Sequence, residues 1–200
     1  MRKVSTITGR AAPLPRNNVD TDQIMPKQHL KRVERSGFGP YVFYDWRYDD
    51  EGEPHADFIL NHPAYQESKV LVTGHNFGSG SSREHAPWGL EDWGFEAVVA
   101  PSFADIFYNN CINIGLLPVV LSEDEVGELT ELAHEPGNHV VIDLDKQTLT
   151  CGDFQATFDI DGHAKHRLAN GLDNVGLTLE NRAMIDDYEK SRPTFKPTVA

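Results

Sequence analysis

Short apolar runs alternate with helix-like patterns in the middle of the chain. Runs of β-branched or small apolar residues at Val70–Thr73, Ala97–Ala100 and positions 116–121 predict buried strands. A stretch with helical spacing of apolar residues follows each run, and Gly94 and Gly115 mark helix ends. This regular alternation of strand and helix predicts an α/β fold whose parallel sheet has right-handed crossovers.

Three serine-to-acid spacings predict where these helices begin. A serine followed three residues later by Asp or Glu fits a capping box, and this occurs at Ser81, Ser102 and Ser122. Pro87 would then be the sixth residue of the first helix, where proline removes a backbone hydrogen bond. We therefore expect this helix to kink or to begin in two steps.

Weaker patterns lie on both sides of this region. Short helices are expected over residues 28–35 and 181–189. Further strands, the last three antiparallel, are expected over residues 6–12, 140–144, 148–151 and 154–160. No shift in composition divides the chain, so we expect residues 1–200 to form a single domain. It should contain a mostly parallel central sheet flanked by helices, with extra short antiparallel strands.

Composition excludes several classes of protein. The 200 residues are 39% hydrophobic and 24% charged, which is typical of a folded chain with one buried core. A net charge of −13 disfavours nucleic-acid binding, which needs a basic surface. No apolar run approaches the roughly 18 residues of a membrane span, and no secretory signal is recognisable. We therefore expect no membrane association.

Cysteine and histidine usage argues against a cofactor held by this chain. Cys111 and Cys151 lack C-x-x-C spacing, which favours reduced thiols in the cytoplasm. Two thiols are too few to hold a cubane iron–sulfur cluster. His62, His75 and His85 lack H-E-x-x-H spacing, so no metal site is expected.

The candidate chemistry lies directly after the strand at Val70–Thr73. Three glycines, Gly74, Gly78 and Gly80, precede the segment Ser81-Ser82-Arg83. A strand, a glycine loop and a helix N-terminus together favour anion binding, and the Arg83 guanidinium matches a carboxylate in bidentate fashion. The spacing fits neither a Walker A loop, nor G-x-G-x-x-G, nor a nucleophile elbow. A pocket for a small anion remains, with an ordinary capped helix as the alternative.

Two other polar segments have both a structural and a functional interpretation. Asp20 and Asp22 lie in a turn-rich stretch, where they either form Asx turns or point at a ligand. A basic cluster formed by Lys27, Lys31, Arg32 and Arg35 is either a solvated helix face or faces a substrate or partner. The aromatic residues 41–48 fit a core or a subunit interface.

Several motifs in order resemble a known family. They are NVDTDQI at residues 18–24, FGSGSSREHAPWGL at 77–90 and APSFADIFYNN at 100–110. They resemble the small subunits of bacterial 3-isopropylmalate dehydratase, which belong to the aconitase superfamily. The resemblance covers nearly the whole chain, through FGPYVFYDWRY and NGLDNVGLTL. One departure is Ser79, where many relatives have a cysteine that is not a cluster ligand.

The resemblance implies a fold, a reaction and a partner. The fold would be a swivelling β/β/α domain. The reaction would convert 2-isopropylmalate and 3-isopropylmalate into each other, by dehydration to isopropylmaleate and rehydration, in leucine biosynthesis. A large subunit would carry the 4Fe-4S cluster and most of the active site. Alternatives are a related hydro-lyase acting on homoaconitate, citraconate or a methylmalate, and a non-enzymatic anion-binding module.

The resemblance also implies roles for particular residues. Ser81 would be the base that removes the carbon-bound proton, and Ser82 and Arg83 would hold a substrate carboxylate. Asp22 would lie near the site and orient Ser81 or Arg83.

The basic cluster lies where the family has its substrate-recognition loop. Lys31 and Arg32 are therefore candidate substrate contacts.

Overall fold

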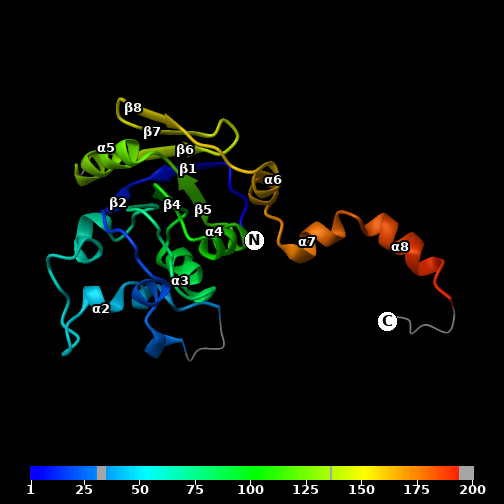
Figure 1. Ribbon diagram of the computed structural model, residues 1–200, viewed down its shortest axis with the longest axis horizontal. Helices are drawn as coiled ribbons and strands as arrows, with labels where there is room; N and C mark the ends of the chain where they lie inside the picture. The colour runs from blue at the N-terminus through cyan, green and yellow to red at the C-terminus, as the bar shows by residue number, and fades with distance from the viewer. Residues whose placement is uncertain (31–34, 136, 194–200) are drawn as a thin grey trace.

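Two four-stranded sheets form the body of the molecule (Figure 1). The computed structural model describes residues 1–30, 35–135 and 137–193. One sheet is parallel, with strand order β2-β3-β4-β5, and the other is antiparallel, with order β1-β6-β7-β8. The strands are β1 (Thr6–Gly9), β2 (Ala11–Leu14), β3 (Val70–Thr73), β4 (Ala97–Ala100), β5 (Leu117–Val120), β6 (Val140–Asp143), β7 (Thr148–Cys151) and β8 (Phe154–Thr157).

Helices cover the parallel sheet and continue beyond the body. The α-helices are α1 (Thr21–Ile24), α2 (Tyr44–Arg47), α3 (His85–Trp93), α4 (Asp105–Ile114), α5 (Glu123–His134), α6 (Gly162–Asn170), α7 (Asn174–Leu179) and α8 (Arg182–Lys190). Short 3-10 turns lie at Lys27–His29, Gly39–Tyr41, Ile59–Asn61 and Pro63–Tyr65. Among the described helices, none is both long and apolar enough to cross a bilayer.

The parallel sheet separates two apolar cores. Side chains alternate across a strand, so Val70 and Val72 of β3 face one side and Leu71 the other. The Val72 side packs against α5 and the antiparallel sheet, and the Leu71 side packs against α3 and α4. This is the mixed α/β architecture expected from the sequence, with the antiparallel strands gathered into a complete second sheet.

The central strands lie where the hydrophobic pattern predicts them, but the strand expected near the N-terminus does not. β3 and β4 coincide with the predicted runs, and β5 lies within residues 116–121. The single strand expected over residues 6–12 is wrong, because the chain leaves the antiparallel sheet after Gly9 and enters the parallel sheet at Ala11. A short helix was expected over residues 28–35, and the structure has a 3-10 turn at Lys27–His29 there. Residues 31–34 lie outside the described residues.

Two of the three predicted helix starts are wrong. α3 begins at His85 rather than after Ser81, and α4 begins at Asp105 without Ser102 as its cap. Only Ser122 forms the expected capping box, at the start of α5. The later start of α3 removes the conflict with Pro87, which becomes the third helical residue, where an amide proton has no intrahelical partner.

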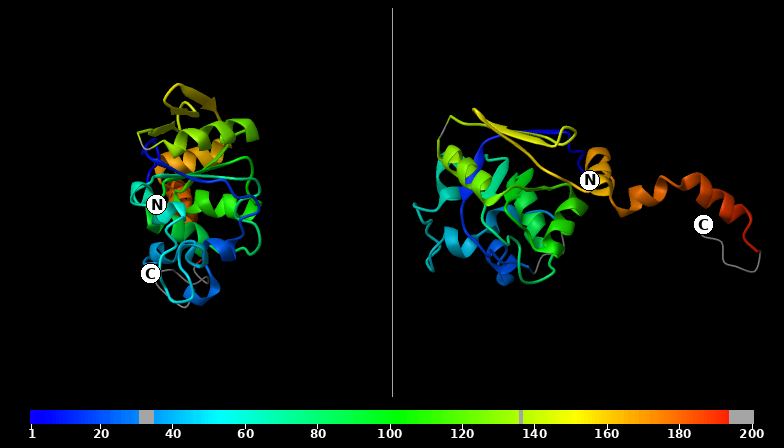
Figure 2. Two further views of the ribbon diagram at one scale, coloured as in Figure 1. Left: turned by 90° about the vertical axis from the view of Figure 1, so that its left-hand side faces the viewer. Right: turned by 45° about the horizontal axis from the view of Figure 1, so that its top comes forward.

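The C-terminal helices α7 and α8 extend away from the body as an arm (Figure 1 and the right-hand view of Figure 2). α8 lies within one residue of the helix predicted over 181–189, whereas α6 and α7 were not predicted. Neither α7 nor α8 contains a buried residue.

Candidate functional site

Two loops that leave the carboxyl ends of β2 and β3 run side by side and are joined by backbone hydrogen bonds. The Asn18 amide donates to the His75 carbonyl at 2.8 Å, and the Gly78 amide donates to the Val19 carbonyl at 2.8 Å. The Thr21 amide then donates to the Ser79 carbonyl at 2.9 Å. The pairing of β2 with β3 therefore continues beyond the sheet and reaches the Ser81 segment.

Two glycines allow these loops to approach each other and α4. Gly78 has a φ of +77°, and a Cβ atom there would lie 2.1 Å from the Phe107 ring on α4. A Cβ on Gly74 would lie 2.2 Å from the Asn17 side-chain oxygen. The prediction that these glycines permit either positive φ or close approach is thus confirmed for both positions.

Polar side chains fix the base of the loop to three strand ends. The Ser102 hydroxyl, after β4, accepts from the Asn76 amide at 2.9 Å and lies 2.8 Å from His75 Nδ1. Asn17, after β2, accepts from the His75 amide at 2.8 Å. Ser102 is therefore engaged in holding the loop and is unavailable as the cap of α4.

Thr21 fixes the backbone of Ser81. Its buried hydroxyl lies 3.2 Å from the Ser81 amide, from which it accepts, and 3.2 Å from the Ser81 carbonyl, to which it donates. One hydroxyl can make both bonds because it has one proton and two lone pairs. The side chains of Ser81 and Ser82 remain exposed at the surface.

Asp22 links two basic side chains at this surface. Its carboxylate forms an ion pair with Arg83 through one oxygen and lies 3.0 Å from Lys27 Nζ through the other. The Arg83 side chain is 28% exposed, so the guanidinium is partly shielded but open to an incoming anion. The structure thus brings Asp22, Ser81, Ser82 and Arg83 into one surface region.

The helix dipole contributes less here than the sequence suggested. Glu84 precedes the first turn of α3 and makes no side-chain capping bond, so Ser81 and Ser82 lie outside the helix. The backbone amides of α3 that lack a hydrogen-bond partner within the helix lie in its first turn, after Arg83. The positive charge beside Ser81 therefore comes from Arg83, and the expected position of Ser81 at the helix N-cap is wrong.

The remaining candidates divide between described and undescribed parts of the chain. Lys31 and Arg32 lie outside the described residues. Arg35 packs over the Trp88 ring at 4.9 Å, which is a cation–π contact with α3. Thr21 lies at the candidate site but was not named from the sequence, whereas Lys27 was named only as a member of the basic cluster. Thr21 lies within the NVDTDQI motif, which was the one signal that could have pointed to it.

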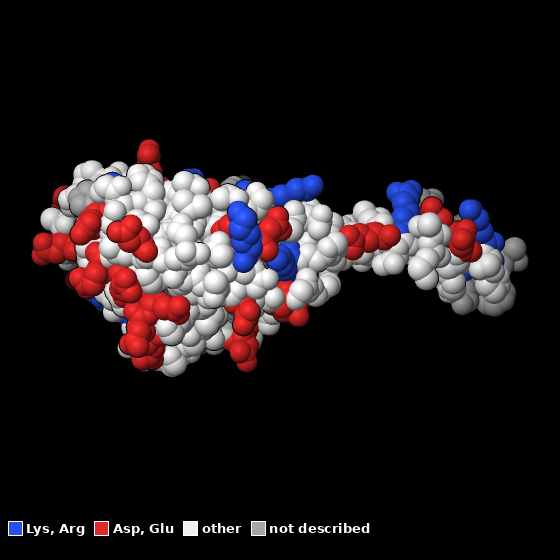
Figure 3. Space-filling model, turned by 90° about the horizontal axis from the view of Figure 1, so that it is seen from above, with Lys and Arg blue, Asp and Glu red and all other residues white. Residues whose placement is uncertain are grey.

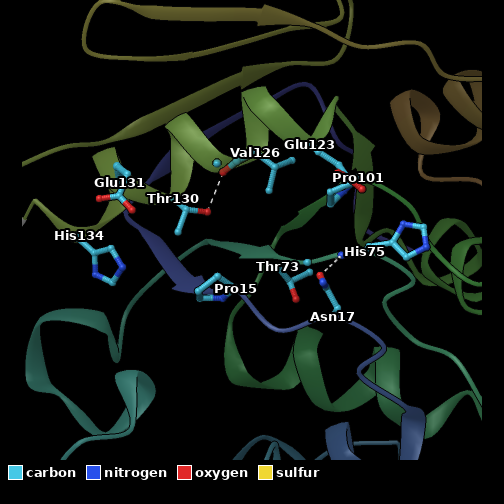
Figure 4. Close-up of a pocket in the computed structure, with 12 residues that line it drawn as sticks. Pro15, Asn17, Thr73, His75, Pro101, Glu123, Val126, Thr130, Glu131 and His134 are labelled. Atoms are coloured by element: carbon cyan, nitrogen blue, oxygen red, sulfur yellow. Dashed lines mark hydrogen bonds between the residues drawn. The ribbon is translucent and has the colours of Figure 1, made fainter.

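A cavity of about 350 Å³ lies beside this region, at the carboxyl ends of β2, β3 and β4 (Figure 4). Asn17 and Thr73 line it from the sheet, and Thr130 and Glu131 line it from α5. Its lining does not include the described residues Ser81, Ser82 and Arg83. The surface that carries the predicted chemistry is therefore distinct from this cavity.

The thiols do not suit a cluster. Cys111 and Cys151 are both buried and free, and they belong to different cores. Burial raises the pKa of the Cys111 thiol well above its ordinary value, which disfavours the thiolate that binds metals. Among the residues described, no group of three or more His, Cys, Asp or Glu side chains could hold a metal ion. The residues present therefore do not fit an iron–sulfur cluster.

Comparison with known proteins identifies relatives over the full chain. The family model of the aconitase C-terminal domain matches residues 1–124. The 3-isopropylmalate dehydratase small subunit of Halalkalibacterium halodurans is 53% identical over 193 residues, covering 96% of this chain and 100% of that protein. The protein of the same name from Dinoroseobacter shibae is 49% identical over 201 residues and is covered completely, as is this chain.

A solved structure agrees with these relatives. The crystal structure of 3-isopropylmalate dehydratase (leuD) from Methanocaldococcus jannaschii has a TM-score of 0.67 and 32% sequence identity. The match covers 92% of this chain and 99% of that one. Sequence and fold therefore point to the same relatives.

Proposed function

The chain belongs to the 3-isopropylmalate dehydratase small subunits, in the aconitase C-terminal domain family, and we propose that its Ser81–Arg83 segment forms one wall of the dehydratase active site. The activity is that of a hydro-lyase made of two subunits. It interconverts 2-isopropylmalate and 3-isopropylmalate through isopropylmaleate, in leucine biosynthesis. The proposal concerns which residues of this chain take part.

In this proposal Ser81 takes the carbon-bound proton of the substrate. A serine hydroxyl is a weak base unless nearby positive charge stabilises the alkoxide, and Arg83 provides that charge. Thr21 holds the Ser81 backbone from both its amide and its carbonyl, so the side chain has a fixed starting point. The observation that carries the proposal is that Ser81 is exposed, has its backbone held by Thr21, and lies two residues before Arg83.

Arg83 and Ser82 hold a substrate carboxylate. A guanidinium presents five N–H donors in a planar fork, so one edge can keep Asp22 while the other receives the substrate. Asp22 would repel a dianionic substrate in direct contact. We therefore give it the role of orienting Arg83, consistent with their ion pair. Lys31 and Arg32 keep their proposed role in substrate recognition.

The proposal includes a large-subunit partner that carries a 4Fe-4S cluster, because the two buried cysteines of this chain do not suit one. When bound there, the cluster supplies Lewis acidity to the hydroxyl that leaves. The substrate is a small dicarboxylate. The net charge of −13 supports a role without nucleic acid. We also propose that residues 1–200 act as one swivel domain, without membrane attachment, in the cytoplasm, where its two free thiols stay reduced.

Replacing Ser81 by alanine tests the proposal. With the large subunit present, we expect Ser81→Ala to lower kcat by about 10²–10⁴-fold, the range typical of a positioned general base. Its affinity for the large subunit should be unchanged, because the loop backbone is held by Thr21. The neighbouring variant Ser79→Ala is the matched control and should keep kcat within about twofold. Undiminished kcat in the assembled Ser81→Ala enzyme would remove Ser81 from the role of base.

A panel of 2-hydroxy acids and of the unsaturated acids formed from such compounds by dehydration tests the substrate. We expect the highest kcat/KM for the isopropylmalates, with homoaconitate, citraconate and methylmalate processed more slowly. A preference for one of those three would assign the chain to a related hydro-lyase.

A further inference from the structure

The arm formed by α7 and α8 has an apolar surface that no other described part of the chain covers. Six large hydrophobic side chains are exposed among the described residues, and four of them lie on the arm. They are Val175, 65% exposed, Leu179, 51% exposed, Met184, 72% exposed, and Tyr188, 58% exposed. Such concentrated exposure is typical of a surface that a partner buries.

The spacing of these side chains makes a stripe on each helix. Val175 and Leu179 are four residues apart on α7, and Met184 and Tyr188 are four residues apart on α8. Residues at this spacing lie on the same helix face. Helices this short are marginal in water without tertiary packing, and α8 buries none of its residues. The arm therefore presents apolar stripes that a partner could bury, and its short helices would be stabilised by such packing.

The base of the arm is fixed to the body, so its direction is defined. His166 Nε2 of α6 lies 2.9 Å from the Glu180 carboxylate, at the end of α7. Arg167 donates to the Asn174 side chain at 3.1 Å, and the Asp173 carboxylate caps α7. The arm thus leaves the body in a set direction.

That direction begins beside the proposed site. A groove of about 210 Å³ joins the start of α7 to the start of α3. Asp173 and Val175 line it on the arm side, and Glu84, Trp88 and Arg35 line it on the site side. Glu84 directly follows Arg83, so this groove connects the base of the arm to the chain next to the proposed site.

The comparisons indicate which partner this is. The aconitase C-terminal domain model ends at residue 124, well before the arm. The alignment with the Dinoroseobacter small subunit covers the whole chain and therefore includes the arm. The arm is thus shared with proteins named as small subunits and lies outside the part that the domain family defines.

We propose that the apolar stripes of α7 and α8 dock into an apolar groove on the large subunit. Charge does not carry this contact, because Lys, Arg, Asp and Glu side chains are mixed along the arm (Figure 3). Arg182 with Asp186 and Lys190 with Asp187 form ion pairs within α8 itself. The inference rests on the proposed function only in requiring a large subunit.

Paired substitutions on the two faces of α8 test this inference. The stripe variant Met184→Gln with Tyr188→Gln removes apolar contacts, and Gln keeps a good helix propensity. The control variant, Arg182→Gln with Lys190→Gln, also introduces two glutamines, but on the opposite face of α8. We measure the Kd for the large subunit by titrating each full-length chain into it, and kcat at saturation.

We expect the stripe variant to raise Kd at least tenfold while kcat at saturation stays within twofold of wild type. The control variant should keep Kd within about twofold. An unchanged Kd in the stripe variant would overturn the docking surface. Sedimentation of the small subunit alone tests whether the stripe instead joins two copies of this chain. If the stripe variant lost a homodimer while its Kd for the large subunit stayed unchanged, the docking surface would likewise be overturned. Failure of the wild-type chain to bind a large subunit would instead contradict the proposed function.

Discussion

At the scale of single residues, the proposed site needs side chains that hold its backbone as well as those proposed to contact the substrate. Thr21 contacts both polar backbone atoms of Ser81, and Ser102 holds the base of the same loop through Asn76. A reactive hydroxyl gains from such support because a small displacement of the base lowers its rate. The loop after β3 is therefore positioned by residues that follow two other strands, β2 and β4.

Removing the Thr21 hydroxyl should slow the enzyme without unfolding it. Thr21→Val keeps the shape of the side chain but leaves the Ser81 amide without its acceptor. We expect kcat to fall about tenfold, equivalent to about 1.4 kcal/mol, with KM changed less. Thr21→Ser retains the hydroxyl and should restore most of kcat. Equal kcat in Thr21→Val and wild type would show that the Ser81 backbone needs no such support.

At the scale of secondary-structure elements, local sequence signals hold where tertiary contacts do not compete with them. The same serine-to-acid spacing occurs three times, yet only Ser122 caps a helix. The Ser102 hydroxyl is hydrogen-bonded to Asn76 and His75, and the Ser81 amide is hydrogen-bonded to the Thr21 hydroxyl. The apolar runs of β3 and β4 are predictable because burial on both faces fixes them. The contact between Thr21 and Ser81 could not be inferred, because proximity between distant segments leaves no local pattern.

The capping box of α5 should make stability depend on acid pH. Hydrogen bonds from the Ser122 side chain and backbone lower the pKa of Glu125, so the folded state favours its charged form. The stabilisation is therefore complete above the unfolded pKa of about 4.3 and is lost as pH falls through the lower folded pKa. We expect Ser122→Ala to cost about 1 kcal/mol of unfolding free energy at pH 7.

Urea unfolding of both proteins at several pH values provides the measurement. The difference between wild type and Ser122→Ala should shrink below pH 4. A difference that stays constant down to pH 3 would show that the Glu125 charge contributes nothing to the cap.

The contact between the site loop and α4 should not tolerate a methyl group. Gly78→Ala combines a positive φ with a Cβ that would overlap the Phe107 ring, which is itself buried. We expect a loss of about 2–4 kcal/mol in unfolding free energy and a large loss of kcat, because the loop must move. The control is Gly52→Ala, which also has a positive φ but nothing within 4 Å. A smaller effect at Gly78 than at Gly52 would contradict this packing.

At the scale of the whole molecule, the body and the arm make separate contributions. Two cores on either side of the parallel sheet hold the body together, and the arm contributes to neither. The stability of the body and the recognition of a partner are therefore located in different parts of the chain.

A chain that ends at Leu172 should remain folded. It keeps α6, whose Leu168 is fully buried, and none of the described residues that it loses, 173–193, has a buried side chain. We expect its thermal unfolding midpoint to stay within about 3 °C of the full chain, because less than about 1 kcal/mol of burial is removed. Scanning calorimetry on both chains provides the measurement. A midpoint lower by 10 °C or more would show that the arm supports the body.

The partnership of β1 with β6 has a consequence for how the chain is made. Thr6 lies opposite Asp143 in this antiparallel pair, so β1 leaves the ribosome long before the strand with which it pairs. Contacts between such distant positions form slowly and leave an unsatisfied edge in the meantime. During synthesis β1 therefore stays unpaired at least until residues 140–143 have left the ribosome.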